Sequence, residues 1–110
     1  MTPLKLVEAQ LAAYNARNLD AFCACFAENI IAYSLKDEKV LLEGIGAFRN
    51  TYEKLFADSP ELHARLVHRT VLNDFVVDEE DVTGRRGQNM RAVAIYKISN
   101  DKISHVWFAT

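Results

Sequence analysis

Four consecutive acidic residues, Asp78 to Asp81, are the clearest candidates for chemistry in this sequence. They lie within a segment, 75–83, whose aromatic and β-branched residues predict a strand. Alternate residues of a strand point to opposite faces, so two of the four carboxylates face inward. A carboxylate in an apolar interior has a raised pKa, which suits a general acid or base. The alternative interpretation is a solvated strand end whose carboxylates pair with the arginines that follow.

Periodicity alone leaves open which pair of carboxylates faces inward. Asp78 and Glu80 share one face of the predicted strand, whereas Phe75 and Val77 could equally mark the opposite face as the inner one. A shift of one residue would reverse every assignment on the strand.

Three tyrosines, Tyr14, Tyr52 and Tyr96, carry rings that can line a pocket and hydroxyls that can bond a ligand. Ordinary core packing is the alternative for each of them. His68 and His105 could each move a proton near neutral pH. Packing or a subunit contact is the alternative for His105, and the strand that holds His68 leaves its orientation open.

Neither a disulfide nor a metal site is predicted. Cys23 and Cys25 stand one residue apart in a predicted helix and point to opposite sides of it, so they cannot bond to each other. The three histidines lie far from this pair in the sequence. We therefore predict two buried thiols in a reducing cytosol. A cytoplasmic protein is also expected because Lys5 and Glu8 interrupt the apolar run that a signal peptide needs.

The composition describes a folded domain without a polyanionic partner. Of the 110 residues, 50% are hydrophobic and 25% charged, and the formal net charge is −2. Disordered chains combine low hydrophobicity with high net charge, so disorder is excluded. A nearly neutral chain also lacks the excess of cations that nucleic-acid binding through bulk charge requires. No apolar run approaches the roughly 20 residues of a membrane helix.

Apolar spacing and turn residues predict nine elements in one domain over 1–110. These are helices over 3–14 and 19–26, strands over 30–35 and 40–42, a helix over 45–58, and strands over 63–72, 75–83, 92–98 and 103–109. A loose loop is predicted over 84–88. The order α-α-β-β-α-β-β-β-β predicts an α+β fold in which one strongly curved antiparallel sheet wraps against three helices in the N-terminal half.

This element order, together with several short stretches, resembles the nuclear transport factor 2-like superfamily, and within it the SnoaL-like and ketosteroid isomerase-like proteins. The stretches are AYNARNLDAF at 13–22, FAEN at 26–29, EG at 43–44, NDFVVD at 73–78 and KISHVW at 102–107. The resemblance covers nearly the whole chain. It implies a cystatin-like cone that encloses an apolar pocket, and a homodimer formed through the outer face of the sheet.

The resemblance also implies which residues face the pocket. It turns Asp78 and Glu80 inward and Trp107 outward. The other side chains expected to line the pocket are Gln10, Tyr14, Ser34, Phe48, Tyr52, Tyr96 and Phe108.

The catalytic positions of the family carry residues that cannot do the same work. Gln10, Ser34 and Ala94 stand where the isomerases have a tyrosine donor, an aspartate base and a protonated acid. Phe108 stands near the place of an acidic residue in the cyclases. The classical isomerase mechanism and the cyclase reaction are therefore disfavoured, although the fold is shared.

Three functions remain open. The first is cofactor-free acid–base chemistry on a small hydrophobic or aromatic molecule, as an isomerase, lyase or cyclase, with Asp78 or Glu80 as the base and Tyr14 or Tyr96 as a hydrogen-bond donor. The second is binding of such a molecule without chemistry. The third is a dimeric adaptor whose pocket is filled by its own aromatic side chains, Phe48, Tyr52, Phe56 and Phe108. No metal, nucleotide, nucleic acid or membrane is predicted as a partner.

Overall fold

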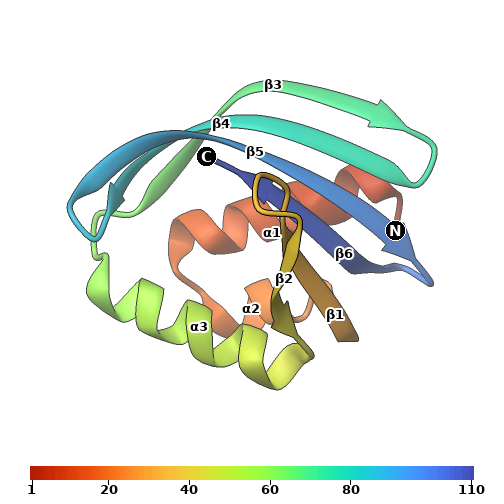
Figure 1. Cartoon of the computed structure of the whole chain (residues 1–110), viewed down its shortest axis with the longest axis horizontal. Helices are drawn as coiled ribbons and strands as arrows, with labels where there is room; N and C mark the ends of the chain where they lie inside the picture. The colour runs from red at the N-terminus through yellow and green to blue at the C-terminus, as the bar shows by residue number, and fades with distance from the viewer.

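The computed structural model describes residues 1–110 and has three helices and six strands in the predicted order (Figure 1). The elements are α1 (Pro3–Ala16), α2 (Leu19–Cys23), β1 (Phe26–Ser34), β2 (Lys39–Glu43), α3 (Ile45–Asp58), β3 (His63–Leu72), β4 (Phe75–Arg85), β5 (Gln88–Ser99) and β6 (Lys102–Ala109). None of the helices is both long enough and apolar enough to cross a membrane.

The two N-terminal helices begin at side chains that accept hydrogen bonds from free backbone N–H groups. Thr2 accepts from the N–H of Lys5 at 3.2 Å, and Asn18 accepts from the N–H of Ala21 at 3.1 Å. The second helix ends at Cys23, three residues earlier than predicted. Phe26 pairs with β6 as the first residue of β1, so its prediction as a helical residue is wrong.

The six strands form one curved sheet in the order β2-β1-β6-β5-β4-β3 (Figure 1). Every neighbouring pair is antiparallel except β1 and β6, which run parallel. The helices lie on the concave side of the sheet, as Figure 1 shows. The predicted α+β cone is confirmed, with one parallel pair, β1 and β6, in an otherwise antiparallel sheet.

The register of β4 is settled by the burial of alternate residues. Val76, Asp78, Glu80 and Val82 are at most 8% exposed, so the even-numbered residues face the concave interior. Glu79 lies on the other face, where it pairs with Arg91.

Single-residue bulges on β3 and β4 interrupt the regular alternation of these strands. On β3 the register shifts between Leu66 and His68, and on β4 it shifts between Val82 and Arg85. The predicted loop over 84–88 is mostly strand, because β4 continues to Arg85 and β5 starts at Gln88. Only two residues separate these strands, and both have positive φ angles, which a tight turn requires.

Aromatic side chains from the helices and β1 fill the closed end of the cone. The ring of Phe48 lies 4.4 Å from that of Phe26 and 4.7 Å from that of Tyr52, measured between centroids. Phe22 lies 4.7 Å from Tyr52 in the same cluster. These contacts hold α2 and α3 together against β1 and fix the floor on which the open part of the cone rests.

Candidate functional site

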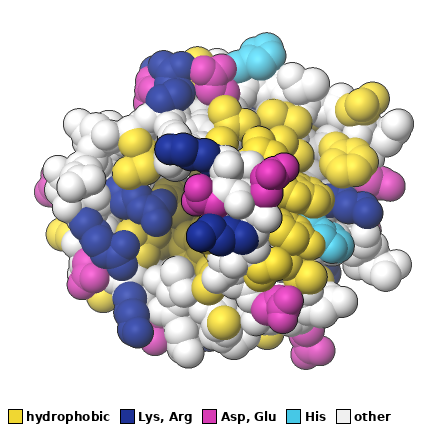
Figure 2. All heavy atoms as spheres, viewed as in Figure 1, with side chains coloured by type: hydrophobic (Ala, Val, Ile, Leu, Met, Phe, Trp, Pro, Cys, Tyr) yellow, Lys and Arg dark blue, Asp and Glu magenta, His cyan; other side chains and the backbone are white.

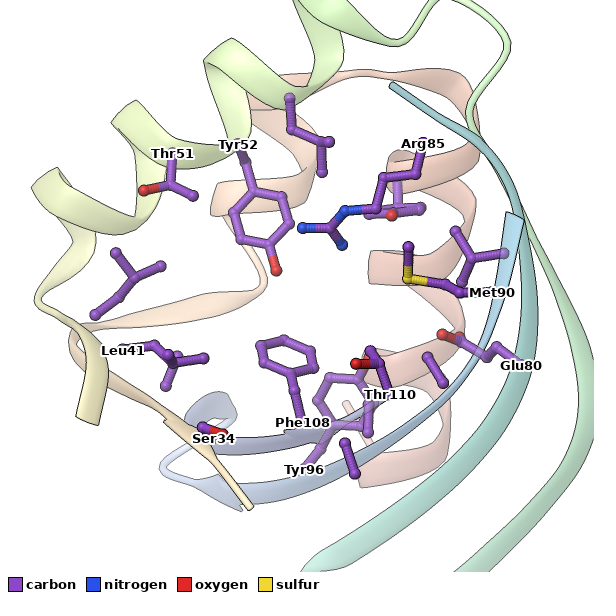
Figure 3. Close-up of a pocket in the computed structure, with 18 of the residues that line it drawn as sticks. Ser34, Leu41, Thr51, Tyr52, Glu80, Arg85, Met90, Tyr96, Phe108 and Thr110 are labelled. Atoms are coloured by element: carbon purple, nitrogen blue, oxygen red, sulfur yellow. The ribbon is translucent and has the colours of Figure 1, made fainter. Parts of the chain in front are cut away.

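A cavity of about 660 Å³ opens between the helices and the concave face of the sheet. Figure 2 shows a hollow on the face viewed there, with Lys and Arg side chains around it. The volume lies within the range of about 300–1,000 Å³ that is typical of small-molecule sites. Most of the lining side chains are apolar, and the close-up in Figure 3 shows polar groups from several elements pointing into the same space.

Glu80 is the acidic group of this interior. It lies on the inner face of β4, is 8% exposed, and has no hydrogen bond or ion pair within the protein. Its partner on β5 is Ala92, whose small side chain leaves space beside the carboxyl group. Desolvation raises the pKa of Glu80 to about 7; the charge of Asp78 adds to the rise and that of Arg69 opposes it. This carboxyl group is therefore able to give or take a proton near neutral pH.

Asp78, the other predicted catalytic carboxylate, does not line the cavity. It is fully buried, and both of its oxygens accept hydrogen bonds from Arg69, at 2.6 Å from Nε and 2.9 Å from Nη2. The bidentate pair holds β3 to β4. Of the two predicted carboxylates, only Glu80 is thus placed where it can meet a ligand.

Tyr96 and Gln10 form a buried polar pair on the cavity wall. The side-chain amide of Gln10, on the buried side of α1, donates to the hydroxyl oxygen of Tyr96 at 3.1 Å. Burial raises the pKa of Tyr96 well above 10, with Glu80 and Asp78 adding to the effect. The hydroxyl therefore keeps its proton and is a neutral hydrogen-bond donor toward the cavity.

Two more hydroxyls come from the helices. Tyr14 and Tyr52 both line the cavity, with ring centroids 6.4 Å apart. Burial raises the pKa of each, and the positive charge of Arg85 partly opposes this rise. The guanidinium group of Arg85 points into the cavity beside Tyr52 (Figure 3).

Arg85 was missed as a site residue by sequence reasoning. Strict alternation from Glu80 places position 85 on the outer face, and the residue was predicted to lie in a loop. The bulge between Val82 and Arg85 adds one residue to β4 and returns Arg85 to the inner face. The available signal was Gly84, since an isolated glycine in a strand marks bulges.

Of the positions taken from the family comparison, Ser34, Ala94 and Phe108 all lie on the cavity wall. The hydroxyl of Ser34 is engaged in the β1–β2 turn, where it donates to the carboxylate of Asp37 at 3.2 Å and accepts from its backbone N–H at 3.1 Å. Ala94 and Phe108 contribute no polar group.

Phe48, predicted to line the pocket, lies outside its lining. The side chain is fully buried within the aromatic cluster that closes the cone. Its place on α3 is one helical turn before Tyr52, so the cluster covers Phe48 and leaves Tyr52 to reach the cavity.

The histidines do not contribute to the cavity. His105 and Trp107 lie on the outer face of β6, where both rings stack with Tyr33 of β1 at centroid distances of 6.2 Å and 5.2 Å. His68 is exposed and stands opposite Glu79 of β4 in the strand register, on the outer face. No group of three or more His, Cys, Asp or Glu residues is arranged to hold a metal ion.

The whole arrangement suits acid–base chemistry on an organic molecule. It combines a carboxyl group that titrates near neutral pH, neutral tyrosine hydroxyls and a guanidinium group around a largely apolar space. A low-polarity cavity strengthens the interactions of these few polar groups with a ligand.

Solved structures share this fold over most of their length. A cystatin-fold protein from Novosphingobium aromaticivorans is 26% identical, with a TM-score of 0.91 over 100% of this chain and 99% of that chain. A candidate polyketide cyclase from Sinorhizobium meliloti is 19% identical, with a TM-score of 0.81 over 96% and 94% of the two chains. A protein with a ketosteroid isomerase-like fold from Catenulispora acidiphila, in complex with trimethylamine, is 16% identical, with a TM-score of 0.81 over 100% and 87%.

The sequence itself matches a family model as well. No curated protein matches the sequence. The model of the SnoaL-like domain matches residues 7–106, which is nearly the entire chain. The chain therefore belongs to the SnoaL-like domain family.

Proposed function

We propose that the protein binds a small hydrophobic or aromatic molecule in its cavity and moves a proton on it, with Glu80 as the acid–base group. The carrying observation is a buried carboxyl group that faces the cavity and has no partner in the protein. The SnoaL-like family, with ketosteroid isomerase-like and cyclase-like structures among its neighbours, supports isomerase, lyase or cyclase chemistry without a cofactor.

The simplest reaction of this class is a proton shift beside a carbonyl group. The carboxylate of Glu80 takes a proton from the carbon next to the carbonyl, and the bonding electrons move onto the carbonyl oxygen as an enolate. The hydroxyl of Tyr96, which also lines the cavity, is the candidate to donate a hydrogen bond to that oxygen. Protonated Glu80 then returns the proton to the same or another carbon. A positioned base of this kind contributes about 10²–10⁴-fold in rate.

Deuterium exchange tests the base without knowledge of the natural substrate. The apolar ketone 2-tetralone is incubated with the protein in deuterated buffer, and loss of its α-proton signals is followed by NMR. We expect wild-type protein to accelerate exchange and Glu80→Gln to lose about 100-fold of that acceleration. Glu79→Gln is the matched control, because it removes a carboxylate one residue away on the outer face. Equal exchange rates in the wild type and both variants would refute the proposal that Glu80 is a catalytic base.

Binding without catalysis is the second candidate function. It is favoured by Ser34 and Ala94, which stand at the isomerases' acid positions without an acidic group. Saturation-transfer NMR with 2-tetralone separates the two functions. Contact between ketone and protein without accelerated exchange indicates a binding protein. The adaptor interpretation required a filled interior, and a cavity of about 660 Å³ argues against it.

We also propose that two copies associate through the outer face of the sheet. Tyr33, His105 and Trp107 form a half-buried stack there, and Ile95 lies beside Trp107 on β5. Aromatic side chains of this kind are enriched at interfaces. Light scattering is expected to give the mass of a dimer for the wild type and of a monomer for Trp107→Glu. A monomeric wild type would contradict the proposal.

A cytoplasmic setting is proposed on the state of the cysteines. Cys23 and Cys25 are both free and buried, and burial raises the pKa of each thiol. Buried neutral thiols are typical of proteins in a reducing compartment. Thiol titration of protein taken from cells under denaturing conditions should find both cysteines reduced.

A further inference from the structure

Arg85 is the one arginine of the chain without a carboxylate or carbonyl acceptor. The other six all have such an acceptor: Arg17 with the carbonyl of Leu62, Arg49 with Asp20, Arg65 with Asp81, Arg69 with Asp78, Arg86 with Asp58, and Arg91 with Glu79 and Asp81. Arg85 is half-buried and lines the cavity. A half-buried cation that lines a cavity and has no counterion in the protein is free to bind an anion supplied from outside.

The backbone before Arg85 has the geometry that turns it inward. Gly84 has a φ of +69°, and a Cβ atom there would lie 2.3 Å from the carbonyl oxygen of Glu61. Only glycine fits this close approach of the chain between α3 and β3. The bulge at the same point sets Arg85 opposite Gln88 and directs its side chain into the cavity (Figure 3). The backbone conformation therefore directs the guanidinium group of Arg85 into the cavity.

The surroundings of the guanidinium group suit an oxyanion attached to an apolar body. Burial raises the pKa of Tyr14 and Tyr52 more than the charge of Arg85 lowers it, so both hydroxyls keep their protons and can donate hydrogen bonds. Beyond them the wall is apolar, with Leu55, Met90 and Phe108. Glu80 lies on another part of the same wall, away from Arg85 (Figure 3).

We propose that the ligand of this cavity is a small aromatic or alicyclic carboxylic acid, bound as its anion, with the carboxylate on Arg85 and the apolar body extending toward Glu80. This inference rests on the proposed function, since it names the class of molecule that the cavity binds. The planar guanidinium group matches the two oxygens of a carboxylate. A single guanidinium group, in a cavity that also holds the carboxyl group of Glu80, favours a monoanion over a phosphate-like dianion.

Three probes of one shape test the charge that the cavity selects. These are 2-naphthoate, 2-naphthylmethanol and 2-naphthylmethylamine, which carry a negative, a neutral and a positive group on the same ring system. Affinities are measured by isothermal titration calorimetry at neutral pH. We expect 2-naphthoate to bind about tenfold more tightly than the alcohol, and the amine to bind no better than the alcohol.

Variants of the arginines then locate the selectivity. Arg85→Gln is expected to weaken 2-naphthoate binding by about tenfold and to leave the alcohol within about twofold of its wild-type affinity. Arg85→Lys should retain part of the preference, because it keeps the charge without the planar fork. Arg91→Gln is the matched control, since it removes the same charge from an exposed position on the outer face.

The outcomes separate this inference from the proposed function beneath it. If the alcohol or the amine binds as tightly as 2-naphthoate, the carboxylic acid class is wrong and the binding function stands. The class is also wrong if Arg85→Gln, shown to be folded by circular dichroism, keeps the preference for the carboxylate. If none of the three probes binds, both the inference and the proposed function are overturned.

Discussion

Replacing Glu80 by Gln is expected to stabilise the protein above neutral pH. The wild-type side chain is 8% exposed and has no hydrogen-bond or ion-pair partner in the protein, so its ionised form loses much of its hydration and gains no counterion. Burial raises its pKa to about 7 in the folded protein, from an ordinary value of 4.5. Between these two values the folded state holds the proton more tightly than the unfolded chain. The free energy of unfolding therefore falls as pH rises through this window.

The size of the effect follows from the same two pKa values. They differ by about 2.5 units, and each unit corresponds to about 1.36 kcal/mol, which gives about 3 kcal/mol in total. The loss is complete only above the folded-state pKa. It amounts to about 1 kcal/mol at pH 5 and about 3 kcal/mol at pH 8. Gln has the same shape without the charge, so the variant escapes this loss.

Urea unfolding of both proteins at pH 5 and pH 8 measures the effect. The stability advantage of Glu80→Gln should grow by about 2 kcal/mol between the two pH values, and ionisation of groups common to both proteins cancels in the difference. Glu79→Gln serves as the control, because its carboxylate is exposed and paired with Arg91; its effect should stay below about 1 kcal/mol at both pH values. An advantage that does not change with pH, or a wild type that is the more stable protein at pH 8, would refute the reasoning.

Three further variants test the surroundings of the cavity. Gly84→Ala should lower the free energy of unfolding in urea by about 2 kcal/mol and weaken 2-naphthoate binding, because the added methyl group meets a backbone carbonyl oxygen. Unchanged stability and affinity would show that the bulge is dispensable. Asp78→Asn leaves the buried cation of Arg69 without its counterion and should lower the free energy of unfolding in urea by about 3 kcal/mol. A loss below about 1 kcal/mol would contradict the stabilising role of the ion pair. Phe48→Ala should cost about 3–5 kcal/mol by the same measurement and leave probe affinity within about twofold; a large loss of affinity at unchanged stability would place Phe48 in the site after all.

The sequence was sufficient to predict the order of the elements and the α+β cone. Periodicity and turn residues carry this information locally, as at Thr2 and Asn18, where the predicted caps form. The boundary between α2 and β1 was not predicted. Phe26 continues the apolar spacing of the helix, and only its long-range pairing with Ile103 assigns it to a strand.

The lining of the cavity was predicted less evenly. Most of the expected residues line it, because a strand or helix that faces an interior presents its apolar and amphipathic side chains there. Phe48 was expected to line the cavity but does not. Helical periodicity predicts which side of α3 faces inward, but not which residue on that side is covered by the aromatic cluster. The phase of β4 was also undetermined by the sequence, since alternation is compatible with either face until the burial of Val76 and Asp78 decides it.

The bulges on β3 and β4 explain why the interior holds one unpaired acid, Glu80, and one cation without a counterion, Arg85. On β3 the extra residue sits between Leu66 and His68, and it brings Arg69 to the inner face opposite Asp78. Without that shift, His68 would stand opposite Asp78 in place of Arg69, and Asp78 would lose its bidentate partner close to the carboxyl group of Glu80.

On β4 the extra residue at Gly84 brings Arg85 to the inner face, five residues beyond Glu80. An arginine directly beside Glu80 would pair with it and hold it ionised, which would remove its capacity to exchange a proton near neutral pH. Placed further along the strand, the cation leaves Glu80 free and is itself free for a ligand's anionic group. Two insertions of one residue each therefore separate proton transfer from anion binding within a single cavity, and strict strand alternation could place neither cation there.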